Sequence, residues 1–105
     1  MELLLFVSSR CPVCPKAERI VKKIARNYSG KGLEFRKVRT KTREGKVLVG
    51  EMNINATPTI IFLDQGGNEV KRIVGVPEES DLKNKVEKML GLKKSPLDRI
   101  LGWRK

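Results

Sequence analysis

The chain has 105 residues, a length that leaves room for one folded domain. Hydrophobic residues make up 39% of it and aromatic residues only 5%, so aliphatic side chains must supply the core. Lys and Arg number 23 against 12 Asp and Glu, a net charge of +11 that attracts polyanions without selecting one. No apolar run approaches the roughly 20 residues of a membrane-spanning helix, and residues 3–7 are too few for a signal-peptide core. The composition excludes a disordered or membrane-embedded chain, and we expect a cytoplasmic protein.

Strand and helix patterns alternate through the first half of the chain. Residues 3–7 are continuously apolar, which predicts a central strand covered on both faces. Apolar residues then recur at helical spacing from residue 17 to 28, and this helix ends near Ser29 and Gly30. Residues 33–39 alternate apolar and charged side chains and predict a second strand. Residues 43–54 fit either a strand or a short helix, because glycines flank their apolar run.

The second half predicts a hairpin and a closing helix. Residues 59–63 and 69–74 are strand patterns joined by turn residues, and Pro77 precedes a helix that Gly91 ends. Residues 92–105 form a basic extension with one further short helix signal. We therefore expect an α/β domain over residues 1–91, with a mixed four-stranded sheet flanked by helices in the order βαβαββα, and a short C-terminal helix after it.

Two cysteines lie where the first strand meets the first helix, in the segment Arg10-Cys11-Pro12-Val13-Cys14. Unpaired amides and the helix dipole stabilise an anion at the start of a helix, so Cys11 is predicted to form a thiolate readily. Arg10 and the nearby Lys16 add positive charge, although both could be ordinary surface cations. Cys11 is then the attacking nucleophile and Cys14, one turn further on, the resolving thiol. Pro12 restricts the loop, and the Pro12-Val13 pair is expected to tune the reduction potential.

A second motif, Ala56-Thr57-Pro58-Thr59, stands at the head of an apolar strand about 45 residues after the cysteines. With the dithiol, the Gly66-Gly67 turn and Gly75 before the last helix, it resembles the thioredoxin/glutaredoxin family over residues 2–90, most of all its small archaeal members. The resemblance implies that Pro58 is cis and lies against the dithiol. It also implies that the Thr57 backbone pairs with an extended substrate segment, in a groove to which Arg10, Val13 and Gly75 contribute. The alternative is that Pro58 is an ordinary proline at the entry to a strand.

The chain also departs from the family pattern. Only ten residues precede Cys11, which implies the shorter glutaredoxin-like core. Arg10 replaces the tryptophan that thioredoxins carry before the first cysteine, and Leu5 stands where they carry a buried aspartate. The usual proton acceptor for Cys14 is therefore missing. The acidic residues after Gly75, which are Glu78, Glu79 and Asp81, are offset from the family's glutathione-binding pair and fit the start of a helix instead.

Other roles for the cysteine pair are a zinc site or a cluster. Structural zinc needs four ligands, and the chain has no third cysteine and no histidine. An iron–sulfur cluster shared between two subunits is a further alternative. We expect no cofactor and no metal.

The composition of the chain, rich in charged residues and with a single Gln, is typical of proteins from hot environments.

The sequence thus predicts a thiol/disulfide oxidoreductase that reduces or exchanges protein disulfides through a mixed-disulfide intermediate. Its expected partners are disulfide-containing proteins and, by the resemblance, a flavin-dependent thioredoxin reductase, with glutathione as the second candidate reductant. We expect a monomer with no membrane partner and no specific nucleic acid, because the basic residues 36–46 include no aromatic side chain to stack on bases. The alternative function is a basic binding module that uses the same fold for an acidic protein or nucleic acid without redox activity.

Overall fold

The computed structural model describes residues 1–91 of the chain. These residues form one four-stranded sheet, three α-helices and a short 3₁₀ turn. In chain order the elements are β1 (Glu2–Val7), α1 (Cys14–Tyr28), η1 (Ser29–Lys31), β2 (Glu34–Arg39), α2 (Arg43–Glu51), β3 (Thr59–Leu63), β4 (Glu69–Val74) and α3 (Glu79–Met89).

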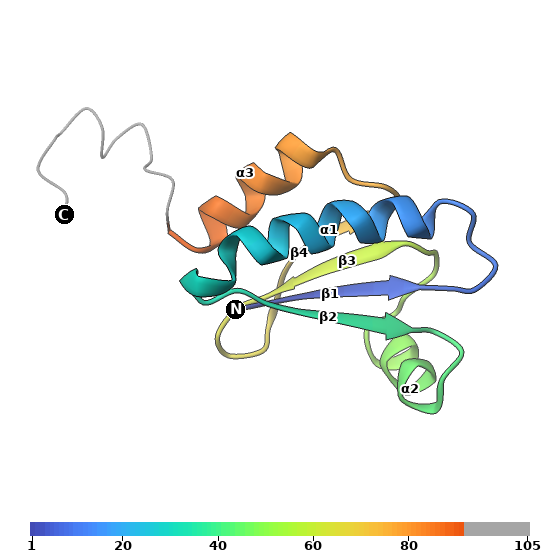
Figure 1. Ribbon diagram of the computed structural model, residues 1–105. Coiled ribbons are helices and arrows are strands. Elements are labelled where there is room, and N and C mark those ends of the chain that lie inside the picture. The colour runs from blue at the N-terminus through green and yellow to red at the C-terminus, as the bar shows by residue number, and fades with distance from the viewer. Residues whose placement is uncertain (92–105) are drawn as a thin grey trace, which may run out of the picture.

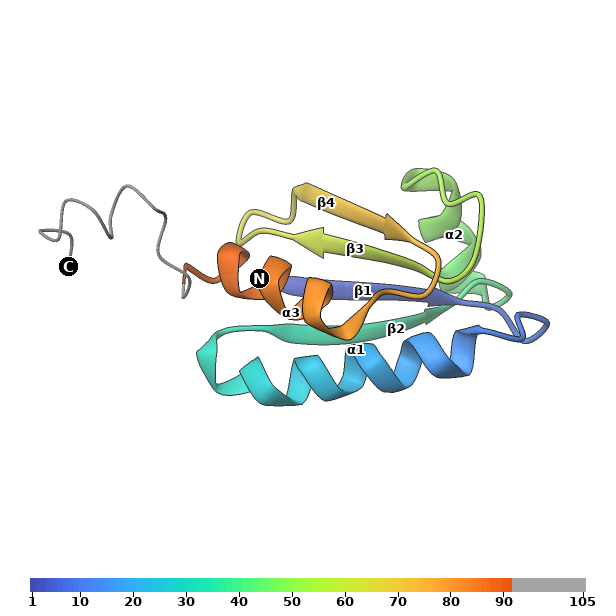
Figure 2. The same cartoon turned by 90° about the horizontal axis from the view of Figure 1, so that it is seen from above.

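The sheet is mixed, with the strand order β2-β1-β3-β4. β1 runs parallel to β2 and antiparallel to β3, and β4 pairs antiparallel with β3 at the edge. Helices α1 and α3 cover one face and α2 covers the other, so the fold has three layers (Figures 1 and 2). The expected fold class and the order βαβαββα are confirmed.

Two apolar cores separate these layers, because alternate residues of a strand point to opposite faces. From β1, Leu3 and Leu5 pack toward α1 and α3, whereas Leu4 and Phe6 pack toward α2. Every residue from Leu3 to Val7 is buried, as the continuous apolar run predicts for a central strand. The strand therefore holds its C-terminal end, where the chain turns toward the cysteines, in a fixed place.

The ambiguous segment 43–54 is helical over α2 and leads to an irregular stretch before β3. Thr42 caps this helix, because its Oγ1 accepts a hydrogen bond of 3.0 Å from the Gly45 N–H and donates one of 2.9 Å to the Arg39 carbonyl. The cap ties the start of α2 to the end of β2. The short helix expected within residues 92–105 lies outside the described residues, and so does the proposed boundary of the C-terminal extension. No helix within residues 1–91 has the length and apolar character needed to cross a membrane.

Candidate active site

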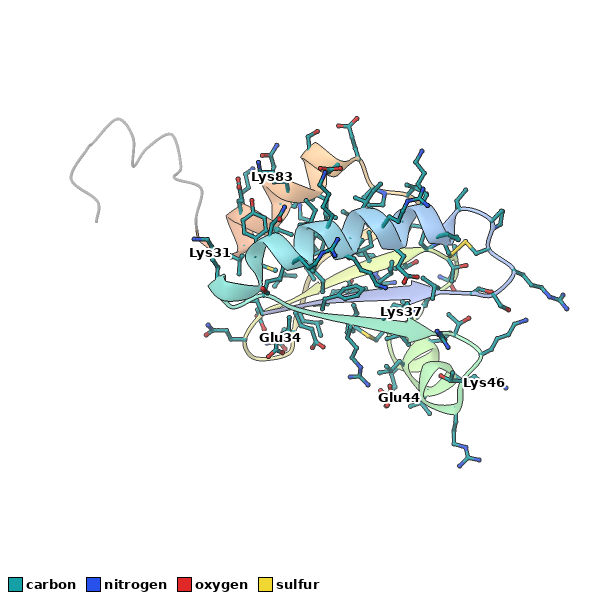
Figure 3. The ribbon with its side chains drawn as sticks, in the orientation of Figure 1. Lys31, Glu34, Lys37, Glu44, Lys46 and Lys83 are labelled. Carbon is teal, nitrogen blue, oxygen red and sulfur yellow. A yellow bond between two sulfur atoms is a disulfide. The ribbon has the colours of Figure 1, made fainter. Side chains whose placement is uncertain are left out.

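A disulfide bond joins Cys11 and Cys14 where the chain passes from β1 into α1 (Figure 3). Their Cα atoms are 5.4 Å apart. Two backbone hydrogen bonds fold the connecting turn, from the Cys11 N–H to the Ser8 carbonyl at 3.2 Å and from the Cys14 N–H to the Cys11 carbonyl at 3.4 Å. α1 begins at Cys14 with Val13 as its N-cap, so Cys11 lies in the turn just before the first helical residue.

The two sulfur-bearing residues differ in exposure. Cys14 is only 3% exposed and belongs to the core cluster that contains Leu5 and Val21. Cys11 is partly exposed and packs at the rim of the same cluster. An incoming disulfide can therefore reach Cys11, whereas Cys14 is screened by the protein. Leu5 is fully buried, and the other buried members of this cluster carry no carboxylate that could take a proton from Cys14.

Thr57, the residue before Pro58, contacts the dithiol. The peptide bond between Thr57 and Pro58 is cis, the geometry that the family resemblance implies. The Thr57 carbonyl oxygen is 3.6 Å from Cys11 Sγ. A sulfur in a disulfide carries no proton, so this is a contact, and it becomes a hydrogen bond only when Cys11 is a thiol. Segments that are 46 residues apart in the chain thus meet at one sulfur atom.

Two further hydrogen bonds fix the Thr57-Pro58 segment. The buried Thr59 hydroxyl donates to the Ala56 carbonyl at 2.6 Å, and the Gly75 N–H donates to the Pro58 carbonyl at 2.8 Å. Gly75 has a φ of +99°, a conformation that glycine adopts without steric cost. Gly75 therefore helps to hold Pro58 in place through this hydrogen bond. The sequence reasoning gave Thr59 no role, although a polar residue at the head of an apolar strand is a usable signal.

The remaining predicted site residues lie on the surface around the cysteines. Val13, which lies between them in the chain, is 45% exposed. Arg10 and Lys16 are exposed, and neither side chain forms an ion pair within residues 1–91. No hydrogen bond joins either cation to the sulfurs. Their proposed role in activating Cys11 therefore has no direct contact to support it.

No potential metal site accompanies the dithiol in the described part of the chain, where no three acidic or cysteine side chains cluster. Glu18, the acidic residue of α1, is occupied elsewhere. Hydrogen bonds from Lys22 and Lys37 hold the pKa of its carboxyl below the usual value, outweighing a modest opposing effect of burial. The two cysteines can cycle between a dithiol and the disulfide seen here.

A mixed sheet between helices, with a disulfide at the start of α1 beside a cis proline, defines the thioredoxin class of thiol–disulfide oxidoreductases. The model of the thioredoxin-like domain family matches residues 2–90, and the chain belongs to this family. A probable thioredoxin of Archaeoglobus fulgidus is 32% identical over 87 residues, which are 83% of this chain and 87% of that protein.

Solved thioredoxin structures share the fold. Thioredoxin 1 of Thermosipho africanus superposes with a TM-score of 0.73 at 23% identity, over 88% of this chain and 97% of that one. The germline-specific thioredoxin Deadhead of Drosophila melanogaster gives a TM-score of 0.72 at 27% identity, over 84% of this chain and 79% of that one. The similarity thus extends over nearly all of the described domain.

Proposed function

We propose that this protein reduces or exchanges disulfide bonds of other proteins, with Cys11 as the nucleophile and Cys14 as the resolving thiol. One observation carries the assignment of roles, namely the difference in exposure between the two cysteines. Cys11 is accessible at the rim of the core, and Cys14 is 3% exposed behind it. An external disulfide can approach only the first, and an internal attack is open to the second.

The proposed cycle starts from the dithiol form. The Cys11 thiolate attacks one sulfur of the substrate disulfide, whose S–S bond breaks and releases one substrate thiolate. The Cys14 thiolate then attacks Cys11 Sγ, the bond from Cys11 to the substrate breaks, and the second substrate thiolate leaves. The substrate gains two electrons and takes two protons from the protein and solvent. The protein loses two electrons and is left with the Cys11–Cys14 disulfide.

Thr57 is proposed to align the substrate. Its N–H donates no hydrogen bond within residues 1–91, and its carbonyl faces Cys11 Sγ. An extended substrate segment could therefore pair with this backbone as an added strand does, which brings the substrate sulfur to Cys11. Val13 and Gly75 would border the same segment, and Pro12 would limit the movement of the Cys11 loop.

Each turnover must be followed by reduction of the protein, since the cycle ends with an internal disulfide. By family analogy we propose a flavin-dependent thioredoxin reductase as the reductant, with glutathione as the second candidate. We also propose that the protein acts as a monomer.

The test compares the reduction of insulin by dithiothreitol with wild type, Cys11→Ser and Cys14→Ser. Wild type should accelerate the reaction, and Cys11→Ser should fall to the uncatalysed rate because no nucleophile remains at the surface. Cys14→Ser should be strongly slowed because the mixed disulfide is not resolved internally. Equal rates for wild type and Cys11→Ser would exclude the redox function and leave the basic binding module.

A further inference from the structure

Five cations lie at the end of the sheet where β1 leads to the dithiol. β1 and β2 are parallel and end together, with Val7 opposite Arg39, so the loops that follow them lie side by side. The Thr40 N–H donates to the Val7 carbonyl at 3.0 Å and holds these loops together. We call this surface the basic edge. It consists of Arg10, Arg39, Lys41, Arg43 and Lys46, all exposed.

The cations of the basic edge are not neutralised by ion pairs among residues 1–91. None of its five side chains forms an ion pair there. Of the carboxylates of the neighbouring helices α1 and α2, Glu18 is paired with Lys22 and Glu44 with Arg36, and Glu51 at the far end of α2 pairs with none of the five cations. The positive charge at this end of the molecule therefore remains available to a binding partner.

A hollow of about 330 Å³ lies beside the basic edge. Lys46 is the charged residue in its wall, and Ser8, Thr40 and Asn55 contribute polar side chains. Thr57, whose carbonyl contacts Cys11 Sγ, forms another part of the wall. A second hollow, lined in part by Arg39 and Lys41, shares Ser8 and Thr40 with the first. One water occupies ~30 Å³ of liquid volume, so the hollow has the volume of about ten waters. This is enough for an Asp or Glu side chain beside Lys46.

We propose that this hollow is a specificity subsite for acidic protein substrates. A substrate segment paired with Thr57 places an Asp or Glu side chain next to Lys46, in the field of Arg39 and Lys41. The proposal rests on the proposed function, since it concerns the same reaction. Surface charges of opposite sign raise association rates, by about tenfold or more at low salt. A nucleic acid fits less well, because the basic edge offers no aromatic side chain for base stacking.

The experiment uses three disulfide peptides that are identical except at two positions flanking one cysteine, which are Glu, Gln or Lys. The full-length protein is reduced with dithiothreitol, freed of reductant and mixed with each peptide in single-turnover measurements. At low salt the Glu peptide should react about tenfold faster than the Gln peptide and faster still than the Lys peptide. The preference should largely disappear at about 0.5 M salt, where the screening length is only ~4 Å.

Two variants with the same change in net charge locate the effect. Lys46→Glu should lower the preference for the Glu peptide about three- to fivefold, as expected for an exposed ion pair. Lys31→Glu should retain the preference, because Lys31 lies at the opposite end of α1 from the disulfide (Figure 3). An equal loss in both variants would show a general charge effect and overturn the subsite.

The outcomes separate the two proposals. If wild type reduces none of the peptides, the proposed function fails and the subsite with it. If it reduces the Glu and Gln peptides at one common rate at low salt, the subsite alone is overturned. Stronger inhibition by a single-stranded oligonucleotide than by polyglutamate of equal charge would assign the basic edge to nucleic acid and likewise overturn the proposal.

Discussion

Substitution of Gly45 by alanine is predicted to destabilise the protein, although alanine is the better helix former. Gly45 is buried in the first turn of α2, against the end of β2. A Cβ atom at this position would overlap the Arg39 carbonyl oxygen and lie 2.7 Å from the Arg39 carbonyl carbon and 2.9 Å from Thr42 Oγ1. These atoms are backbone and a capping hydroxyl that are hydrogen-bonded to each other, so neither can move aside without breaking the cap.

The size of the effect follows from two opposing contributions. Overpacking of this kind costs about 2 to 3 kcal/mol or more when the backbone must shift, and replacing a helical glycine by alanine returns about 1 kcal/mol. Gly45→Ala should therefore lose about 1 to 2 kcal/mol of unfolding free energy. Gly50 provides the control in the same helix, because a Cβ there meets nothing within 4 Å. Gly50→Ala should gain about 0.5 to 1 kcal/mol.

The two variants should be compared with wild type in the oxidised form, by urea and thermal unfolding followed by far-ultraviolet circular dichroism. The predicted difference between them is about 1.5 to 3 kcal/mol, which corresponds to roughly 10 °C in Tm for a domain of this size. If Gly45→Ala proves as stable as Gly50→Ala, the close approach of α2 to β2 is not as described, and the wall of the Lys46 hollow is misplaced with it.

Two hydrogen bonds to carboxylates, both away from the dithiol, give further predictions. Tyr28 donates a hydrogen bond to Glu87, and this bond, with burial, raises the pKa of Tyr28 to about 12. Because the pKa of Tyr28 is higher in the folded than in the unfolded protein, this hydrogen bond should stabilise the fold fully below pH ~10 and lose its effect as the pH rises toward ~12. Urea titrations should show this loss of unfolding free energy in wild type and not in Tyr28→Phe. Arg72 donates to the Met52 carbonyl at 2.7 Å and to the Glu69 carboxylate at 2.8 Å, so Arg72→Met should cost about 1 to 2 kcal/mol in chemical denaturation at neutral pH. The Arg72 hydrogen bond lowers the pKa of Glu69, so this difference should be present above pH ~4.5 and shrink as the pH falls through the lowered value; a constant difference would contradict the ion pair.

Much of the fold could be predicted from the sequence because its signals are local. The apolar run in β1 and the helical spacing in α1 each specify one element without reference to the rest of the chain. α2 could not be assigned in this way, since Gly45 and Gly50 weaken the helical signal. Gly45 is required by its contact with the end of β2, and such a contact between distant elements leaves no local pattern.

The same distinction between local patterns and long-range contacts applies to the site. The spacing of Cys11 and Cys14 at the end of an apolar strand was enough to locate the dithiol. The approach of Thr57 to Cys11 spans 46 residues, and it was expected only through the family resemblance. The hollow beside Lys46 depends on three segments, after β1, after β2 and before β3, that meet at one end of the sheet. From the sequence alone, Lys46 was one of many cations on a solvated face.

The central claim is that Cys11 attacks the substrate and Cys14 resolves the intermediate. The most direct measurement is mass spectrometry of Cys14→Ser after mixing with a disulfide peptide, with Cys11→Ser as the matched variant. We expect Cys14→Ser to hold one peptide per chain on Cys11, and Cys11→Ser to hold little because Cys14 is buried. Equal adduct formation on Cys14 in Cys11→Ser would contradict the account.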